Sequence, residues 1–307
     1  MRKLHYRIVD VFTNRAFGGN PLAVFPDAGE LPLNLMQSIA KELNLSETTF
    51  VTPARDAQHD FRVRIFTPAS ELPMAGHPTV GTAYVLAREG MIERSETATK
   101  VNFEEGVGTI PVTINFRDGV PDWIEMQQPS PTFGPRITDV EAVAQMLSLD
   151  AEAIKATSLP LEVVSCGVPF LFVPLRNLES IRKIRFRLDV WEKALRNAGV
   201  PMEVFVFTEE VETAGSRVHS RMFAPALGIG EDPATGAASG PLGCYLVRHG
   251  IVRAEPRVEL ISEQGIEMNR PSFIKIGIEQ TAGEITRVTV SGQCYFMGAG
   301  YLEVEQA

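Results

Sequence analysis

The feature that most constrains the fold of this chain is an internal repeat at an offset of about half its length. Residues 66–69 (FTPA) match residues 223–226 (FAPA), and residues 77–83 (HPTVGTA) match residues 232–238 (DPATGAA). The offset is 155 to 160 residues in a chain of 307. Solenoid repeats have periods of roughly 20 to 50 residues, so an offset this long indicates a duplicated domain.

The repeat predicts two halves with the same α+β architecture. A chain of 307 residues suits two cores, because single cores stop growing at roughly 250 to 300 residues. We place the boundary near the proline-containing stretch 126–135, which gives an N-terminal half of residues 1–126 and a C-terminal half of residues 127–307. The last strand of the chain is a candidate to return to the N-terminal half. The default ligand site is a cleft between the halves.

Strand signals dominate the sequence, and most of them alternate. Phe61, Val63 and Ile65 fall on one face of a strand, and two alternating runs within residues 108–126 meet at Asp118-Gly119, a dipeptide typical of tight hairpins. This alternation favours antiparallel pairing. In each half we therefore expect a mostly antiparallel, barrel-like sheet wrapped around one central helix.

The two central helices are predicted from residues 78–90 and 233–250. Each stretch opens with proline, which suits the first helical position, and ends at a glycine. The residue before each proline, His77 or Asp232, is then predicted to be the helix cap.

Composition and charge limit the partners. The net charge is −9 and the basic residues are scattered, which argues against nucleic-acid or membrane binding and favours a small-molecule ligand. The three cysteines, Cys166, Cys244 and Cys294, fit neither a disulfide framework nor a zinc site. The histidines are dispersed without metal-ligand spacing. We expect a cytoplasmic protein without a metal.

His77 has a structural and a functional interpretation. In the structural interpretation His77 only caps the helix, although histidine is not a favoured cap. The neighbouring Gly76 and Gly81 favour function, because glycines let a ligand approach the backbone N–H groups at the positive end of a helix.

Asp232 is a good cap by itself, and only its match to His77 in the repeat favours a role in binding. If the two helix N-termini face one cleft, an imidazole and a carboxylate meet the same small molecule. Two helix dipoles directed at one site favour an anionic ligand such as a carboxylate.

Glu47 also has two interpretations. The commoner one is a solvated carboxylate at a strand edge. However, Glu47 is the only ionisable residue between Asn44 and Pro53. Burial there raises the pKa of a carboxyl group, which would let Glu47 both take and return a proton.

Several segments together resemble the PhzF-like phenazine-biosynthesis family. In chain order they are VDVFTNRAFGGNPLAVF, LSETTFV, FTPASELPMAGHPTVGTA, EDPATGAASG and SEQG followed by RPSF. They extend over nearly the whole chain, and as a set they are specific.

The resemblance implies a diaminopimelate epimerase-like fold, a homodimer, and an isomerase site without a cofactor. In the phenazine enzyme the substrate is trans-2,3-dihydro-3-hydroxyanthranilate, and a glutamate matching Glu47 moves a proton between carbon atoms. The family's site residues carry over to Asn20, Glu47, Gly76, His77, Asp232 and Gly236.

One site position departs from the family pattern. Ala237 stands where the family commonly has a serine that helps to anchor the substrate, and Ser239 points to roughly the opposite helix face. The phenazine substrate is therefore in doubt. Related racemases and epimerases use two cysteines in these glycine loops, and both loops lack them here.

Glu47, His77 and Asp232 are accordingly our candidate catalytic residues, and Asn20, Gly76, Gly236 and Ala237 our candidate binding residues. We expect a cofactor-independent isomerase that acts on a small cyclic or unsaturated carboxylate. Two alternatives remain: a non-catalytic ligand-binding or interaction protein that keeps the fold, and an epimerase or racemase that does not use paired cysteines.

Overall fold

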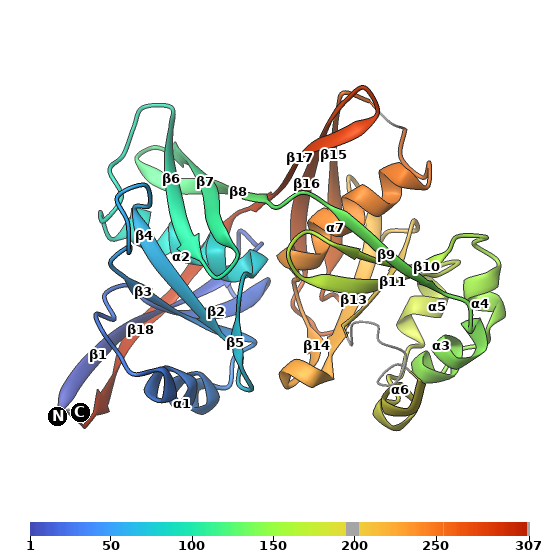
Figure 1. Cartoon of the computed structure of the whole chain (residues 1–307), viewed down its shortest axis with the longest axis horizontal. Helices are drawn as coiled ribbons and strands as arrows, with labels where there is room; N and C mark the ends of the chain where they lie inside the picture. Colours follow the sequence, from blue (N-terminus) through green and yellow to red (C-terminus); the bar gives the residue numbers. More distant parts are fainter. Residues whose placement is uncertain (195–202, 254, 306–307) are drawn as a thin grey trace. The chain divides into compact units, whose positions relative to one another are not determined.

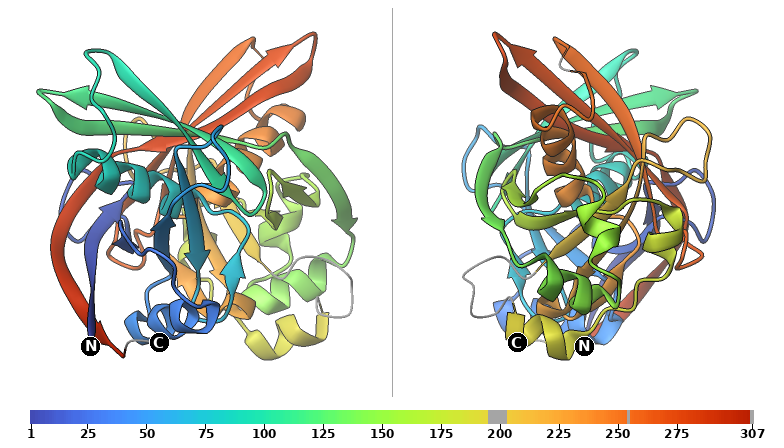
Figure 2. Two further views of the ribbon diagram at one scale, coloured as in Figure 1. Left: turned by 60° about the vertical axis from the view of Figure 1, so that its left-hand side comes forward. Right: turned by 90° about the vertical axis from the view of Figure 1, so that its right-hand side faces the viewer.

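The computed structural model describes residues 1–194, 203–253 and 255–305, and it forms two compact units. Unit 1 consists of Met1–Gln127 and Thr289–Ala307, and unit 2 of Gln128–Val288. The C-terminal strand β18 (Cys294–Val304) lies in unit 1, antiparallel to β1 (Arg2–Val11) over the whole of that strand (Figure 1; Figure 2, left, red beside blue). The end of the chain thus completes the sheet that the start of the chain begins.

Unit 1 is a curved, mostly antiparallel sheet around one helix. Its other elements are β2 (Asn20–Phe25), α1 (Leu33–Leu43), β3 (Glu47–Thr52), β4 (Phe61–Phe66), β5 (Glu71–Leu72), α2 (Gly76–Arg88), β6 (Ala98–Glu105), β7 (Gly108–Arg117) and β8 (Val120–Gln128). The strands pair in the order β18-β1-β2-β3-β4-β6-β7-β8, with β5 on β4. Only β2–β3 and β4–β6 are parallel among these pairs.

Unit 2 has the same topology. Its elements are β9 (Thr132–Ile137), α3 (Val140–Leu147), α4 (Glu152–Lys155), β10 (Leu161–Ser165), β11 (Pro169–Pro174), α5 (Leu178–Arg182), α6 (Leu188–Ala194), β12 (Val204–Thr208), β13 (Val218–Ala224), η1 (Pro225–Leu227), β14 (Ile229–Asp232), α7 (Gly236–Arg248), β15 (Arg257–Gln264) and β16 (Ser272–Thr281). Strand β17 (Glu284–Gly292) begins in unit 2, and its residues from Thr289 on belong to unit 1. The order β9-β10-β11-β12-β13-β15-β16 again has two parallel pairs, β11–β12 and β13–β15, and β14 pairs with β13. The predicted α+β fold with an internal duplication is confirmed.

Each unit is built on a buried central helix. Every residue of α2 from Gly76 to Ala87 is buried, and the helix contacts β1, β2, β3 and β7. Helix α7 is buried from Gly236 to Val247 and contacts β10, β11 and β16 (Figure 1). A helix that is apolar or small on all its faces belongs inside a core, so both helices act as the axis around which a sheet curves.

The starts of the central helices differ from the prediction. Helix α2 begins at Gly76 and α7 at Gly236, with Ala75 and Thr235 as the N-caps. His77 is therefore a residue of the first turn rather than a cap. Asp232 is the last residue of β14, because a residue before proline favours extended backbone.

These boundaries also correct the register of the repeat. Strand β5 ends at Leu72 and β14 at Asp232, and three residues then lead to each helix. The structure thus equates Gly76 with Gly236, and His77 with Ala237. The sequence match had paired His77 with Asp232, because the His-Pro and Asp-Pro dipeptides resemble each other.

The predicted hairpin at Asp118-Gly119 is present between β7 and β8. Both residues have positive φ, 52° and 75°, and Arg117 pairs with Val120 across the turn. Positive φ at both central residues is the geometry that makes Asp-Gly favourable in two-residue hairpins.

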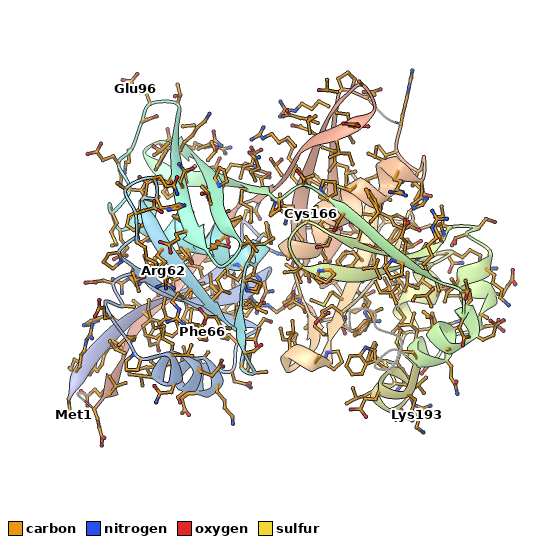
Figure 3. The ribbon with its side chains drawn as sticks, viewed as in Figure 1. Met1, Arg62, Phe66, Glu96, Cys166 and Lys193 are labelled. Atoms are coloured by element: carbon orange, nitrogen blue, oxygen red, sulfur yellow. The ribbon has the colours of Figure 1, made fainter. Side chains whose placement is uncertain are left out.

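A second apolar layer in each unit lies outside the central helix. In unit 1, α1 packs Met36 and Ile39 against a group that includes Phe25, Phe50 and Phe66 (Phe66 is labelled in Figure 3). In unit 2, α3 to α6 cover the other face of the sheet, with Trp191 in the layer beneath them. None of the helices in the described residues is both long and apolar enough to span a membrane.

Gly81 is explained by packing. A Cβ at Gly81 would lie 2.6 Å from Leu22 Cδ2 and 2.7 Å from Val11 Cγ2, so the absence of a side chain lets α2 approach β1 and β2. The ligand-approach interpretation of Gly81 in the sequence is therefore replaced by a structural one.

We predict that Gly81→Ala lowers the free energy of unfolding by about 0.5–2 kcal/mol. Alanine gains roughly 0.5–1 kcal/mol over glycine in a helix interior, but overpacking a filled core costs more than this. Gly298→Ala is the matched control, because a Cβ there meets no atom within 4 Å. Denaturant unfolding measures both variants, and equal stability of the two would contradict the prediction.

Candidate functional site

Three buried polar residues of unit 1 meet at the start of the central helix. Asn20 is the first residue of β2, Glu47 is the first residue of β3, and His77 lies in the first turn of α2. Their exposed fractions are 0%, 7% and 3%. Asn20 Nδ2 lies 3.2 Å from His77 Nδ1, and His77 Nε2 lies 3.3 Å from Glu47 Oε2. The structure thus brings together three of the residues selected from the sequence, beside Gly76.

His77 is a neutral imidazole in this setting. Burial lowers its pKa to about 3, because a charged ring loses its hydration. The amide nitrogen of Asn20 can only donate, so Nδ1 of His77 accepts and the ring proton is on Nε2. That nitrogen is the one that lies 3.3 Å from Glu47 Oε2.

Glu47 is buried, which excludes a solvated carboxylate at a strand edge. Its position comes from the parallel pairing of β2 and β3, which sets Glu47 opposite Leu22. A carboxyl group beside a neutral N–H donor can exist in both protonation states without forming a fixed ion pair. Such a group is chemically suited to accept and return a proton.

The candidate residues of unit 2 lie at the start of α7. Asp232 is 3% exposed, and its Oδ2 accepts a hydrogen bond of 2.6 Å from the hydroxyl of Thr235. Gln264 Nε2 donates to the carbonyl of Asp232 at 2.8 Å and to Thr235 Oγ1 at 2.9 Å, while its Oε1 accepts from the N–H of Thr235 at 3.0 Å. Asp232 is therefore held by its neighbours at a fixed position before the helix.

Gly236 and Ala237 are the first two residues of α7, and both are buried. The carbonyl of Gly236 accepts a hydrogen bond of 2.9 Å from Gln128 Nε2. Ser239 cannot replace the hydroxyl that Ala237 lacks, because its own hydroxyl donates to the carbonyl of Thr235 at 2.9 Å. The first turn of α7 thus presents a methyl group where α2 presents an imidazole.

Thr79 and Glu105 were not selected from the sequence, but they support the first turn of α2. Thr79 Oγ1 lies 2.6 Å from the carbonyl oxygen of Ala75 and 2.5 Å from Glu105 Oε1. Burial raises the pKa of Glu105 to about 8. The sequence does contain a sign that Glu105 matters, because the internal repeat matches residues 104–106 (EEG) with residues 263–265 (EQG).

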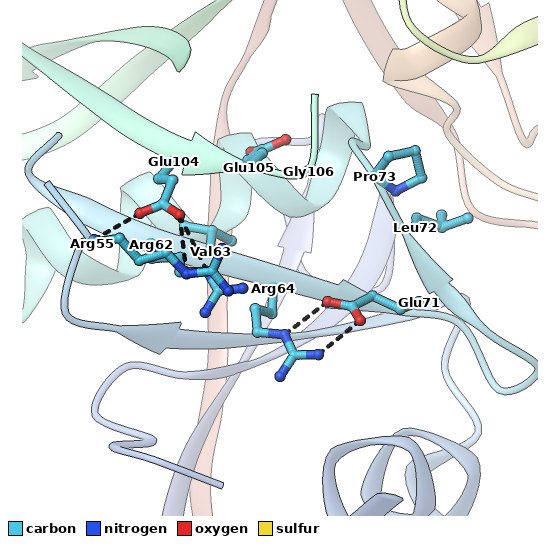
Figure 4. Close-up of a pocket in the computed structure, with 10 residues that line it drawn as sticks. All are labelled: Arg55, Arg62, Val63, Arg64, Glu71, Leu72, Pro73, Glu104, Glu105 and Gly106. Carbon is cyan, nitrogen blue, oxygen red and sulfur yellow. Dashed lines mark hydrogen bonds and ion pairs between the residues drawn. The ribbon is translucent and has the colours of Figure 1, made fainter. Parts of the chain in front are cut away.

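A pocket of about 400 Å³ lies in unit 1 between β4, β5 and the end of β6 (Figure 4). Three arginines line it, and each forms an ion pair with a glutamate of the same pocket: Arg64 with Glu71, and Arg55 and Arg62 with Glu104. Because every arginine is ion-paired and Glu104 is shared by two of them, only one positive charge is in excess, and the pocket is a weak candidate for an anion site. Its main relevance is that Glu105 lines it.

Glu212, His219 and Glu267 are the possible metal ligands that cluster within the described residues. Nδ1 and Nε2 of His219 each lie 2.9 Å from a carboxylate oxygen, of Glu263 and of Glu267. Burial alone lowers the pKa of His219, but these hydrogen bonds outweigh it and raise the pKa to about 9. Both ring nitrogens of His219 are thus occupied by Glu263 and Glu267, and Glu212 is exposed and ion-paired with Arg182, so the cluster is a weak candidate for a metal site.

We predict opposite protonation states for the two buried histidines. Since the pKa of His77 is lowered to about 3 and that of His219 is raised to about 9, His77 should stay neutral between pH 5 and pH 8 and His219 charged. Side-chain ¹⁵N chemical shifts measure both states and the tautomer of His77. Protonation of His77 near pH 6.5 would contradict its assignment as a neutral donor.

Comparison with known proteins identifies the family of this chain. The family model of phenazine biosynthesis-like proteins (PhzC-PhzF) matches residues 9–300. A trans-2,3-dihydro-3-hydroxyanthranilate isomerase from Pseudomonas chlororaphis is 38% identical over 96% of this chain and 98% of that relative.

Solved structures share this fold. A PhzF-family phenazine biosynthesis protein from Bacillus anthracis has a TM-score of 0.87 and 27% identity, covering 99% of this chain and 100% of that one. A hydroxyproline epimerase from Agrobacterium vitis, 15% identical, has a TM-score of 0.68 over 98% of this chain and 91% of that one, which shows a shared fold. The chain therefore belongs to the phenazine biosynthesis-like (PhzC-PhzF) family and is an isomerase.

Proposed function

We propose that this isomerase moves a proton between two carbon atoms of a small cyclic or unsaturated carboxylate, with Glu47 as the acid/base. The observation that carries the proposal is the burial of Glu47 beside the neutral ring of His77. In a site from which water is excluded, a carboxylate is a stronger base than in water because it has lost its hydration.

The proposed reaction is an allylic proton shift. Glu47, as carboxylate, removes a proton from a carbon next to the double bond, and the negative charge spreads over the unsaturated system and its carboxylate. The resulting Glu47 carboxylic acid then gives the proton to a different carbon, so that no hydrogen is gained or lost. Backbone N–H groups at the start of a helix are suited to stabilise the transient anion.

His77 and Asn20 have supporting roles in this mechanism. Asn20 fixes the tautomer of His77, and the N–H of His77 then faces Glu47. A hydrogen-bond donor at that place favours the carboxylate form and fixes its orientation toward the substrate. Because the ring is neutral, it does not hold Glu47 in a permanent ion pair, so the base remains available.

The names of the relatives suggest the first substrate to test. Trans-2,3-dihydro-3-hydroxyanthranilate is named for isomerases of Pseudomonas chlororaphis and Pseudomonas aeruginosa that are 38% and 36% identical to this chain. Ala237 replaces the serine expected for that substrate. We therefore propose the wider class of cyclic β,γ-unsaturated amino or hydroxy acids.

We predict that Glu47→Gln lowers the rate of substrate isomerisation and of solvent deuterium exchange by about 10²–10⁴-fold, the usual contribution of a general acid/base. Exchange in heavy water is followed by mass spectrometry with trans-2,3-dihydro-3-hydroxyanthranilate and related acids. Glu42→Gln is the control, because Glu42 is an exposed glutamate of α1. Equal exchange by Glu47→Gln and by the unmodified protein would show that another group is the base.

The prediction that Asp232, Gly236 and Ala237 bind the substrate has a separate test. Asp232→Asn keeps an oxygen that accepts from Thr235 but removes the charge. We expect kcat/KM to fall about tenfold to a hundredfold, equivalent to about 1.4–2.7 kcal/mol, with a melting temperature close to that of the unmodified protein. An unchanged kcat/KM would remove Asp232 from the binding site.

An epimerase that does not use paired cysteines is the second candidate, and the shared fold with a hydroxyproline epimerase favours it. Cys166, Cys244 and Cys294 all lie outside the first turns of α2 and α7, so a two-thiol mechanism is not available there. Chiral chromatography of amino acids incubated with the protein distinguishes the two, because an epimerase inverts a centre without moving a double bond.

The family resemblance also predicts a homodimer. Light scattering of the purified protein during size-exclusion chromatography measures the mass, which for one chain is 33.7 kDa.

A further inference from the structure

Glu105 ends a short chain of hydrogen bonds that leads to the start of α2. Its Oε1 lies 2.5 Å from Thr79 Oγ1, which in turn lies 2.6 Å from the carbonyl oxygen of Ala75, the N-cap of the helix. Ala75 directly precedes Gly76 and His77. Glu105 is 6% exposed, and its second oxygen has no hydrogen-bond partner within the described residues.

Counting protons in this chain fixes the state of Glu105. Both contacts have the length of O–H···O hydrogen bonds, so each needs one hydrogen. The carbonyl of Ala75 can only accept, and the hydroxyl of Thr79 has a single proton to give. If Thr79 donates to Ala75, the hydrogen between Thr79 and Glu105 must belong to Glu105, which is then a carboxylic acid.

The second unit has a side chain that cannot ionise at the position that matches Glu105, although it contacts different atoms. Gln264 is the last residue of β15, as Glu105 is of β6. The amide of Gln264 donates to Thr235 Oγ1 and to the carbonyl of Asp232 just before α7. The glycine that follows each of them, Gly106 or Gly265, leaves no room for a Cβ against Pro73 or Pro233. At matching ends of β6 and β15, unit 1 thus has an ionisable side chain that contacts Thr79 in the first turn of α2, and unit 2 has a permanent donor that contacts the N-cap Thr235 of α7.

We infer that Glu105 is a positioning residue that holds the first turn of α2, and with it His77, only while its carboxyl group is protonated. The effect of this protonation on catalysis rests on the proposed function of Glu47 and His77. The hydrogen bonds from Glu105 to Thr79 and Ala75 do not depend on that function.

The surroundings of Glu105 make its ionisation possible but unfavourable. Burial raises its pKa to about 8, which means that the acid form dominates at neutral pH. The charged groups that line the same pocket are Arg62 and Arg64 of β4, Glu71 of β5, Glu104 of β6 and Arg55 (Figure 4). They form ion pairs with one another, and on α2 His77 is neutral. Glu105 itself lines this pocket and is 6% exposed.

Loss of the proton redirects the hydrogen bonds. A Glu105 carboxylate attracts the proton of Thr79 more strongly than a carbonyl does, because hydrogen bonds to charged acceptors are the stronger ones. Ala75 and Thr79 then face each other with two oxygen atoms and no hydrogen between them. The first turn of α2 has to move to separate them, and His77 moves with it, away from its present distances to Asn20 and Glu47.

The activity test compares pH profiles of kcat/KM for the unmodified protein, Glu105→Gln and Glu104→Gln. We expect the unmodified protein and Glu104→Gln to lose about tenfold per pH unit above about pH 8. Glu105→Gln, which copies Gln264, should keep activity at neutral pH and lose this alkaline fall or shift it by at least one pH unit. An unchanged alkaline fall in Glu105→Gln would overturn the inference.

Two spectroscopic measurements on the unmodified protein need neither a substrate nor the variant. Infrared spectroscopy should show a protonated carboxyl group at pH 6.5 that disappears with a midpoint near pH 8. The side-chain ¹⁵N resonances of His77 should shift with the same midpoint. If both signals titrate together but no substrate exchanges, the inference stands and the proposed function fails. If no carboxyl titrates near pH 8, or if His77 does not respond, the inference fails whatever the activity.

Discussion

The burial of a polar helix start is the constraint on which the rest of unit 1 depends. Helix α2 is enclosed by its sheet from its first residue, so the groups of its first turn cannot be satisfied by water. Buried polar groups without partners each cost roughly 1–3 kcal/mol. Asn20, Thr79 and Glu105 supply the partners, from β2, from the helix itself and from β6. A site built in this way is rigid because the same hydrogen bonds maintain the fold.

Both units have a central helix whose first turn is buried, but different side chains provide its hydrogen-bond partners in the two units. Unit 1 places an imidazole in the first turn of its central helix and a carboxylic acid beneath it. Unit 2 has the methyl group of Ala237 at the matching position, and it holds Asp232 and Thr235 with the neutral amide of Gln264. In unit 1, burial thus keeps both the imidazole of His77 and the carboxyl group of Glu105 uncharged at neutral pH, whereas the matching positions of unit 2, Ala237 and Gln264, cannot ionise.

Much of the fold followed from the sequence because it depends on local patterns. The repeat, the alternation in strands such as residues 61–66 and the Asp118-Gly119 hairpin each specify a feature by themselves. The register of the repeat did not follow, since His-Pro and Asp-Pro look equivalent as sequences while the backbone places one inside a helix and the other at the end of a strand. The roles of Thr79 and Glu105 depend on contacts 26 residues apart, which no local pattern encodes. Only the EEG and EQG match hinted at them.

The two uncharged groups beside the start of α2 also set how the stability of the fold depends on pH. The pKa of His77 is about 3 in the folded protein against 6.5 when solvated, so its contribution is complete above pH 6.5 and declines as the pH falls toward 3. The pKa of Glu105 is about 8 against 4.5, so its contribution is complete below pH 4.5 and declines as the pH rises toward 8. Between pH 4.5 and 6.5 one contribution grows as fast as the other shrinks, so their sum is flat. Above pH 6.5 only the contribution of Glu105 still changes, and it falls until about pH 8. Of these two groups, Glu105 alone therefore lowers the stability of the fold at alkaline pH.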